Sequence, residues 1–370
     1  MKIGFDGRFA QNELTGVGKY IKNLIEGIAR QGFKCIVFYS QKPEYPIIGK
    51  NIKNRVIRGN KYLWEQILLP KALKQEKIDI YHALGNVGIP LFCPIPSVLT
   101  VHDLIPLLQK NYFEKSKISL LSKKLYYWRS KTSLQKAQKI ITDTKWTKKI
   151  IVKLFKIQSS KITVIYLDSS LPKELDNKAH LQFNLKKENY IINNGGIDRR
   201  KNLINLITAF ALVQTKIPQL KLVITGQNRN FLPVLKKEIQ RKKLTRKVIF
   251  TGFLKEEKLW GLLKNALCLC YPSKIEGFGL PIIEAFRTDT PVIASNIPIL
   301  REIGNNACLF VDPNQPQVIN QAIIKLAQTP KLQKELIARG RKRARIFSWK
   351  KTIKETTKIY NKFLKKNKTK

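Results

Sequence analysis

The sequence alternates twice between short apolar runs and helical stretches along its 370 residues, with a polar interval between the two series. Strands that are separated by helices pair in parallel, and the helices then cover both faces of the sheet. The order of the segments therefore predicts an α/β fold with two doubly wound, Rossmann-like domains that face a cleft. Ligands of such sheets bind at the carboxyl ends of the strands.

Each series holds six predicted strands, and residues 167–188 between the series are polar and lack periodicity. We therefore predict an N-terminal domain over 1–170, a C-terminal domain over 188–349 and a basic amphipathic helix over 350–370. The predicted strands are Lys2–Phe5, Lys34–Tyr39, Ile78–His82, Ser97–His102, Ile140–Thr142, Ile162–Tyr166, Tyr190–Asn193, Lys221–Thr225, Val248–Phe250, Cys268–Tyr271, Pro291–Ala294 and Ala307–Val311.

The net charge is unusual, because 70 Lys and Arg against 25 Asp and Glu give +45. A polycation can bind nucleic acid or an anionic membrane surface, or its charge can reflect a compositional bias of the source genome. Lys outnumbers Arg by 54 to 16, whereas proteins that read bases favour Arg. This ratio disfavours specific nucleic-acid binding and leaves the other two interpretations open.

One segment, Lys110 to Lys156, is denser in charge, with 14 Lys or Arg and two acids. Its aromatic and leucine side chains are typical of a helix that lies on an anionic leaflet. An ordinary amphipathic helix with solvated lysines explains the same pattern.

The sequence also indicates a compartment. No apolar run reaches the length of a membrane span, and the first residues do not resemble a secretory signal. The five cysteines include no C-x-x-C pair, which argues against disulfides and a zinc site. Cys268 and Cys270 are predicted to be buried strand residues. We therefore expect a cytoplasmic protein.

The stretch Tyr271 to Glu284, YPSKIEGFGLPIIE, joins a buried strand to a helix through a glycine-rich loop. Glycines let backbone N–H groups approach a ligand closely, and a helix N-terminus attracts phosphate. Glu276 and Glu284 could accept hydrogen bonds from sugar hydroxyls. The alternative is that Glu276 is solvated and that Glu284 stabilises the dipole from the first helical turn.

A second stretch, Asn193 to Asn202, lies between a strand and a helix and places Arg200 and Lys201 at the helix start. Cations are unfavourable at a helix N-terminus, which indicates an anionic ligand. A glycine-rich turn with solvated bases is the alternative. A third feature, the turn at Gly16 and Gly18, lacks the third glycine of a dinucleotide fingerprint, and this argues against NAD(P).

The three histidines differ in placement. His102 ends a predicted strand, where its side chain could donate to a sugar hydroxyl or an oxyanion. His82 sits similarly and is assigned a structural role more readily, whereas His180 is predicted on the surface. No two aspartates lie two residues apart, so the sequence holds no D-x-D clamp for a metal and a diphosphate. Protein cations and helix N–H groups would have to neutralise the diphosphate.

Taken together, these motifs resemble the retaining glycosyltransferases of family four, also called group 1. The resemblance rests on the two glutamates eight residues apart around G-F-G-L-P and extends over most of the chain. It includes the segments FDGRFAQNELTGVGKYIKNLI, LTVHDLIPL, GGIDRRKNLINLITAF, VIFTGFL, YPSKIEGFGLPIIEA and FSWKKTIKETTKIY. The chain is especially similar to the mannosyltransferase-like branch. The resemblance implies the GT-B fold, with the last helix packing back on the N-terminal, acceptor-binding domain.

The resemblance also implies roles for the matching residues. Glu276 and His102 would act at the donor sugar, and Glu284 would bind the ribose. Arg200 and Lys201 would hold the diphosphate. Gly196 stands where members often have an additional Arg. The residues that would line the rest of the donor site are Gly277, Phe278, Gly279, Leu280, Gly16 and Gly18.

The implied activity is metal-independent transfer of a hexose with retention, and no cofactor is expected. Mannose from GDP-mannose is the expected donor, and a lipid-linked or oligosaccharide acceptor would receive it during synthesis of O-antigen, capsule or another surface polysaccharide. Such an enzyme would work on the inner face of the plasma membrane. The alternatives are a UDP-sugar-dependent transferase with a soluble acceptor and a non-enzymatic nucleic-acid-binding protein.

Overall fold

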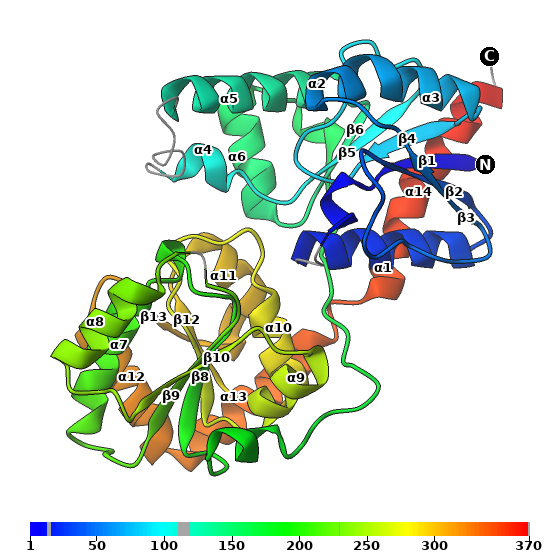
Figure 1. The fold of residues 1–370 in the computed structure, drawn as a ribbon. Helices are drawn as coiled ribbons and strands as arrows, with labels where there is room; N and C mark the ends of the chain where they lie inside the picture. Colours follow the sequence, from blue (N-terminus) through cyan, green and yellow to red (C-terminus); the bar gives the residue numbers. More distant parts are fainter. Residues whose placement is uncertain (13–15, 110–118, 229, 369–370) are drawn as a thin grey trace. The chain divides into compact units, whose positions relative to one another are not determined.

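The computed structural model describes residues 1–12, 16–109, 119–228 and 230–368, and the chain divides into two compact units. The N-terminal unit comprises Met1–Leu167 together with Ser348–Lys370, and the C-terminal unit comprises Asp168–Phe347. Each unit is built on one parallel sheet with helices on both faces (Figure 1). The predicted α/β class with two doubly wound domains is therefore confirmed.

The sheet of the N-terminal unit has the order β3-β2-β1-β4-β5-β6-β7 among its described strands. The first strand thus lies between the second and the fourth. All strands are parallel, and the order in which the chain adds strands to the sheet changes direction between β1 and β4. Its strands are β1 (Lys2–Asp6), β2 (Lys34–Tyr39), β3 (Ile52–Val56), β4 (Ile80–Ala83), β5 (Ser97–Val101), β6 (Lys139–Thr142) and β7 (Ile162–Val164). Its helices are α1 (Gly16–Arg30), α2 (Lys61–Leu63), α3 (Leu69–Gln75), α4 (Ile105–Leu108), α5 (Ser119–Lys136), α6 (Lys145–Phe155) and α14 (Trp349–Lys368), with a π-helical turn at Trp64–Leu68.

The C-terminal unit repeats this topology with the order β10-β9-β8-β11-β12-β13. Its strands are β8 (Tyr190–Asn193), β9 (Lys221–Thr225), β10 (Val248–Gly252), β11 (Cys268–Tyr271), β12 (Val292–Ser295) and β13 (Leu309–Val311). Its helices are α7 (Leu203–Gln214), α8 (Leu232–Arg241), α9 (Glu256–Lys264), α10 (Leu280–Arg287), α11 (Pro298–Gly304), α12 (Pro316–Gln328) and α13 (Pro330–Ala344).

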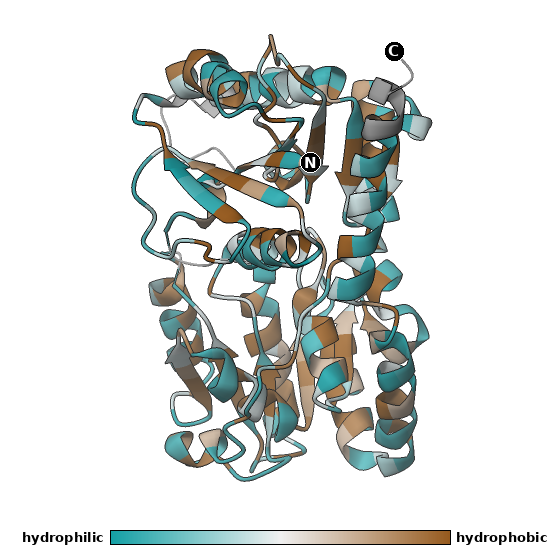
Figure 2. Ribbon diagram, turned by 90° about the vertical axis from the view of Figure 1, so that its right-hand side faces the viewer, coloured by the Kyte–Doolittle hydropathy of each residue, from teal (hydrophilic) through white to brown (hydrophobic). Residues whose placement is uncertain are grey.

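The central strands are apolar throughout because helices cover them on both faces. All four residues of β11 are buried, so the prediction of a buried Cys268 and Cys270 is confirmed. The strands of the C-terminal unit are mostly brown in Figure 2, whereas the connecting loops are mostly teal. Their side chains, with those of α7 and α12, form one continuous core.

Two predictions about local structure are wrong. Gly16 and Gly18, predicted in a turn that also included Leu14 and Thr15, belong to the first turn of α1; Thr15 and Leu14 lie outside the described residues. The described part of the basic segment 110–156 forms α5, β6 and α6, and β6 confirms the strand predicted at Ile140–Thr142. His180 is buried rather than on the surface, since the short helix Ala179–Phe183 packs against α9.

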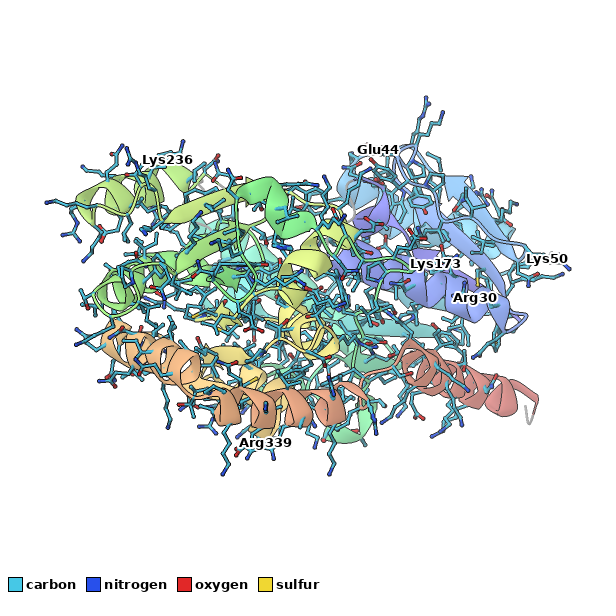
Figure 3. The ribbon with its side chains drawn as sticks, turned by 90° about the horizontal axis from the view of Figure 1, so that it is seen from below. Arg30, Glu44, Lys50, Lys173, Lys236 and Arg339 are labelled. Atoms are coloured by element: carbon cyan, nitrogen blue, oxygen red, sulfur yellow. The ribbon has the colours of Figure 1, made fainter. Side chains whose placement is uncertain are left out.

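The basic side chains are spread over both units. Arg30 on α1, Lys50 in a loop, Lys236 on α8 and Arg339 on α13 point away from the ribbon in Figure 3. This distribution fits a general bias in composition better than a single charged face. Within the described part of the chain, no helix is long and apolar enough to cross a bilayer.

The last helix, α14, belongs to the N-terminal unit and lies beside α1 (Figure 1). The two helices approach closely at Gly27, where an added Cβ would lie 2.0 Å from Cδ1 of Ile353. A glycine at this position therefore permits the crossing. The hydroxyl of Tyr360 on α14 also meets Nδ1 of the buried His82 at 2.6 Å, which ties the helix to β4.

We expect Gly27→Val to lower the free energy of unfolding by about 1–3 kcal/mol, because the new side chain overpacks the crossing of α1 and α14. Urea unfolding of the variant and the wild type measures the change. The double variant Gly27→Val, Ile353→Ala provides the control, since it removes the clashing atoms and should recover part of the loss. An unchanged midpoint in the single variant would contradict the tight crossing.

Candidate functional site

The candidate site of the C-terminal unit lies at the carboxyl ends of β8 and β11. These two strands are neighbours, and the strand order runs in opposite directions on either side of them. Open α/β sheets bind ligands at such a switch point. The loops after β8 and β11 carry most of the residues that the sequence predicts for the donor.

The loop after β8 folds back sharply through two glycines. Gly195 and Gly196 have φ values of 131° and 86°, which side chains with a Cβ rarely adopt. A Cβ at Gly226, after β9, would lie 2.6 Å from the backbone nitrogen of Gly196. The close approach of the two loops thus requires glycine at position 226, whereas at Gly196, which stands where members often have an additional Arg, it is the positive φ that favours glycine.

Arg200 and Lys201 lie in a short 3-10 turn, Arg199–Lys201, and not at the start of α7 as predicted. Asp198 caps this turn by accepting a hydrogen bond from the backbone N–H of Arg200 at 3.0 Å. Asn202 then takes a left-handed conformation and donates to the carbonyl groups of Pro272 and Pro313. These bonds hold both cations in a fixed position relative to the loop after β11.

Glu276 is buried between the two cations. Its Oε1 lies 2.7 Å from Nζ of Lys201, and its Oε2 lies 3.0 Å from Nη1 of Arg200. Residue Glu276 is 6% exposed and Lys201 is 3% exposed. The alternative of a solvated Glu276 is therefore wrong, and the structure brings these three predicted residues into one cluster.

The titration of the cluster follows from burial and pairing. Burial would raise the pKa of Glu276, but Lys201 and Arg200 outweigh it and lower that pKa to about 2. Burial lowers the pKa of Lys201 to about 8, against the opposing effect of Glu276. At neutral pH the carboxylate of Glu276 is therefore ionised and Lys201 is mostly protonated. A second carboxylate, that of Asp198, lies 3.5 Å from Nε of Arg200 and is 22% exposed, so it pairs with this base at a longer distance than Glu276 does.

Tyr271, the last residue of β11, completes the cluster and was not predicted as a site residue. Its hydroxyl accepts a hydrogen bond from Nζ of Lys201 at 2.7 Å, and burial raises its pKa well above the usual value. Tyr271 therefore stays neutral and fixes the ammonium group. Its place at a strand end is the only signal that the sequence offers.

Glu284 lies on α10, in the second turn and not in the first as predicted. Its carboxylate accepts hydrogen bonds from Nδ2 of Asn194 at 2.7 Å and from Oγ of Ser169 at 3.1 Å. These two neutral side chains orient the carboxylate. Asn194 and Ser169 were missed by the sequence reasoning, since neither residue belongs to a recognisable charged pattern.

The remaining predicted residues of this loop have mixed surroundings. Gly279, with a φ of 108°, caps the N-terminus of α10, where Leu280 is the first helical residue. Gly277 is partly exposed beside Glu276. Phe278 is buried and its ring packs edge-on against Phe347 at 6.0 Å. Phe278 thus supports the loop from within the core.

His102 lies in the N-terminal unit, after β5, and both of its ring nitrogens have partners. Nδ1 lies 2.6 Å from Oδ2 of Asp143, and Nε2 lies 3.1 Å from the carbonyl oxygen of Leu84. Burial lowers the pKa of His102, but Asp143, the carbonyl group of Leu84 and Asp103 together outweigh burial and raise that pKa. Two acceptors on one ring are consistent with an imidazolium. The predicted catalytic role of His102 stays a prediction.

His82 is a structural residue. It is fully buried, and its two nitrogens meet the hydroxyl groups of Tyr360 at 2.6 Å and Thr100 at 2.8 Å. Burial lowers its pKa to about 3, so the ring is neutral. Gly18 is buried in α1 and Gly16 is exposed at its start, and their predicted contact with donor phosphates stays a prediction.

Two family models match the chain, one in each half. The model described as Glycosyltransferase Family 4 matches residues 14–167, and the model described as Glycosyl transferases group 1 matches residues 176–343. The second range includes Arg200, Lys201, Glu276 and Glu284.

Similar proteins cover almost the whole chain. The sequence is 26% identical to O-antigen chain mannosyltransferase B of Escherichia coli, over 97% of this chain and 99% of the relative. The fold is similar to that of a sucrose-phosphate synthase from Thermosynechococcus elongatus, with a TM-score of 0.80, 20% identity and coverage of 98% and 99%. It is equally similar to Anabaena Alr3699/HepE in complex with UDP, with a TM-score of 0.80, 16% identity and coverage of 98% and 100%.

The pairing of Glu276 predicts how stability depends on pH. The pKa of Glu276 in the folded protein, about 2, lies below the ordinary value of 4.5. Its contribution to stability is therefore present above pH 4.5 and is lost as the pH falls towards 2. We expect Glu276→Gln to cost about 3 kcal/mol at pH 7, because it leaves buried Lys201 without its anion.

Urea unfolding between pH 7 and pH 3 measures the difference in the free energy of unfolding between the wild type and Glu276→Gln. This difference should become smaller below pH 4.5. Glu335→Gln on α13 is the matched control, since Glu335 is 44% exposed and pairs only weakly with Arg339. A difference that is constant with pH, or absent, would contradict a buried and ionised Glu276.

Proposed function

We propose that this chain, a glycosyltransferase with the GT-B fold, transfers mannose from GDP-mannose to a growing, lipid-linked glycan of a cell-surface polysaccharide. The observation that carries the proposal is the buried cluster of Arg200, Lys201 and Glu276 at the switch point of the C-terminal sheet. The similarity to an O-antigen mannosyltransferase supports mannose as the sugar. The UDP that the similar Anabaena protein binds supports a nucleotide-linked donor.

The two bases suit the departing diphosphate. Transfer from a nucleotide sugar places negative charge on the leaving diphosphate, and fixed cations in a buried site stabilise such charge strongly. Arg200 and Lys201 are fixed by Asp198, Tyr271 and Glu276 before any ligand binds. Since these side chains supply the cations that a diphosphate needs, the proposal includes transfer without a metal ion.

The two glutamates have different tasks in this proposal. Glu276 fixes both cations and lies where the hexose joins the diphosphate. Asn194 and Ser169 orient the carboxylate of Glu284, which suits it to accept hydrogen bonds from the two hydroxyls of a ribose. We propose a retaining reaction, in which the acceptor attacks the same face through an oxocarbenium-like state and the diphosphate takes its proton.

The test incubates the protein with membrane extract and tritiated GDP-mannose, UDP-glucose or UDP-N-acetylglucosamine. We expect label from GDP-mannose in the lipid fraction and an α-linked product by NMR, because the donor is α-linked. A folded protein that labels lipid from none of the donors would refute the proposed function. Labelling from a UDP-sugar alone would refute GDP-mannose as the donor and support the UDP-sugar-dependent alternative.

We expect Lys201→Met to lower the rate of transfer by about 10²–10³, because one preorganised cation at the leaving group is lost. Initial rates at saturating donor measure the change. Lys236→Met on α8 is the matched control, since Lys236 is exposed and points away from the ribbon (Figure 3). Equal rates for the two variants would contradict the assignment of the leaving-group site.

The lipid-linked acceptor makes association with a membrane surface part of the proposal. On α5, Leu121, Leu125 and Trp128 are 64%, 38% and 51% exposed. Their spacing of four and three residues places them along one side of the helix, among Lys123, Lys124 and Lys131. An apolar stripe flanked by lysines is suited to the surface of an anionic bilayer.

We expect the protein to sediment with vesicles that contain phosphatidylglycerol and not with pure phosphatidylcholine, and the bound fraction should fall as salt rises. The double variant Leu121→Ser, Trp128→Ser should bind several-fold more weakly, because it removes the apolar stripe. Val234→Ser on α8 is the control, since Val234 is 44% exposed in the other unit. Binding that is unchanged in the double variant would refute the role of α5.

A further inference from the structure

A cavity of about 510 Å³ lies within the N-terminal unit. It opens at the carboxyl ends of the central strands: Arg8 follows β1, Asn86 and Val87 follow β4, and His102 follows β5. In this sheet β1 lies between β2 and β4, so the cavity occupies the switch point. It thus corresponds in topology to the donor site of the C-terminal unit, and its volume is typical of a small-molecule site.

Two arginines form one wall of this cavity, and Glu65 joins them. Oε2 of Glu65 lies 3.1 Å from Nη2 of Arg8 and 2.6 Å from Nη2 of Arg129. Arg8 also pairs with Asp6 at 2.7 Å. The side chains of the two arginines are 13% and 11% exposed, and that of Glu65 is 5% exposed.

This wall carries no net charge. Two guanidinium groups face two carboxylates, and His102, also on the wall, is paired with Asp143. A phosphate or carboxylate ligand would find each of these cations already neutralised and would lose its own hydration. The charge balance therefore disfavours an anionic ligand, although the protein as a whole is strongly cationic.

The wall still offers hydrogen-bond donors. A guanidinium has five N–H groups, and among the described residues the hydrogen bonds of Arg8 use Nε and Nη2, while that of Arg129 uses Nη2. Nη1 of both arginines and Nε of Arg129 are left for a ligand. Such groups donate well to neutral hydroxyl oxygens.

The local backbone around Glu65 has a conformation that is typical of functional sites. Glu65 lies in the π-helical turn Trp64–Leu68, and π-helical turns are rare and frequent at functional sites. The guanidinium carbon of Arg8 lies over the ring of Trp64, 4.1 Å from the ring centroid. Phe9 and Tyr126 add aromatic surface to the cavity. Aromatic rings beside hydrogen-bond donors whose charge is balanced by carboxylates match the C–H and hydroxyl faces of a pyranose.

We propose that this cavity binds the terminal sugar of the acceptor as an uncharged pyranose, with Arg8 and Arg129 donating to its hydroxyl oxygens. Glu65 acts as a positioning residue that holds both guanidinium groups and, together with Asp6, balances their charge. The inference rests on the proposed function and deepens it, because it names the chemical class of the acceptor: a neutral hexose end, and not a phosphorylated sugar or a uronic acid.

The first test measures binding to the wild-type protein by ligand-observed NMR, without any transfer. The probes are the octyl glycosides of mannose, glucose, galactose and N-acetylglucosamine, with octyl mannuronide, glucuronide and galacturonide as the acidic counterparts of the three hexosides. We expect at least one neutral glycoside to bind tenfold or more tightly than its uronide. A uronide that binds as tightly as its neutral counterpart, or the absence of binding by all neutral glycosides, would overturn the inference.

The second test changes the charge of the wall. Glu65→Gln leaves two guanidinium groups with one carboxylate, so we expect the affinity for the uronide to rise at least tenfold relative to the neutral glycoside. Glu355→Gln on α14 is the matched control, because Glu355 is 37% exposed and pairs with Lys358 on the same helix. An unchanged preference in a folded Glu65→Gln protein would contradict the positioning role.

Arg129→Gln provides a second variant if Glu65→Gln does not fold. It should weaken binding of the neutral glycoside at least tenfold, and unchanged binding would refute the contact. Binding of GDP and UDP, measured in parallel, separates the two proposals. Glycoside binding without nucleotide binding would refute the proposed function alone, whereas nucleotide binding without glycoside binding would refute the acceptor site alone.

Discussion

The buried carboxylate of Glu276 fixes the chemistry of the C-terminal unit. It keeps two neighbouring bases protonated and in place, although burial by itself would favour a neutral Lys201. The carboxylate of Glu276 contacts both bases within 3.0 Å, whereas that of Asp198 lies 3.5 Å from Arg200. The surrounding backbone supports this geometry: glycines bring two loops together, and Asn202 links the turn that carries the bases to the loop that carries Glu276. The same side chain thus stabilises the fold and holds the two bases that we propose for the diphosphate.

The two sheets share the strand order that leaves space for a ligand at the carboxyl ends of the strands. In each unit the first strand lies between the second and the fourth, so the loops after the first and the fourth diverge and leave space at the sheet edge. In the C-terminal unit two bases lie there around the buried carboxylate of Glu276, with Asp198 farther from Arg200. In the N-terminal unit two arginines lie there and pair closely with Glu65 and Asp6. We propose that this difference in charge pairing, on the same scaffold, suits one site to an anionic donor and the other to a neutral sugar.

The sequence predicted the fold class and nearly all strands, because buried parallel strands are short runs of β-branched and aromatic residues that stand out in a lysine-rich chain. It missed β3, whose sequence Ile52–Val56 is mostly exposed and polar at the sheet edge. The clustering of Arg200, Lys201 and Glu276 was predictable from their positions after two strands. The roles of Tyr271, Asn194 and Asp143 were not, since these side chains act through contacts between residues 41 to 90 positions apart. Arg8, Glu65 and Arg129 escaped notice for the same reason: a charge-balanced wall resembles ordinary surface residues until the chain is folded.

The position of α14 has a consequence for synthesis of the protein on the ribosome. The C-terminal unit is continuous in sequence, so all its residues have been synthesised before α14 is made. The N-terminal unit lacks Ile353 and Tyr360 until α14 has been made, and these residues fill the contact at Gly27 and bond to buried His82. Of the two units, the one whose synthesis begins first is therefore the last to complete its core, and the side of α1 that contacts α14 stays uncovered while the C-terminal unit is being made.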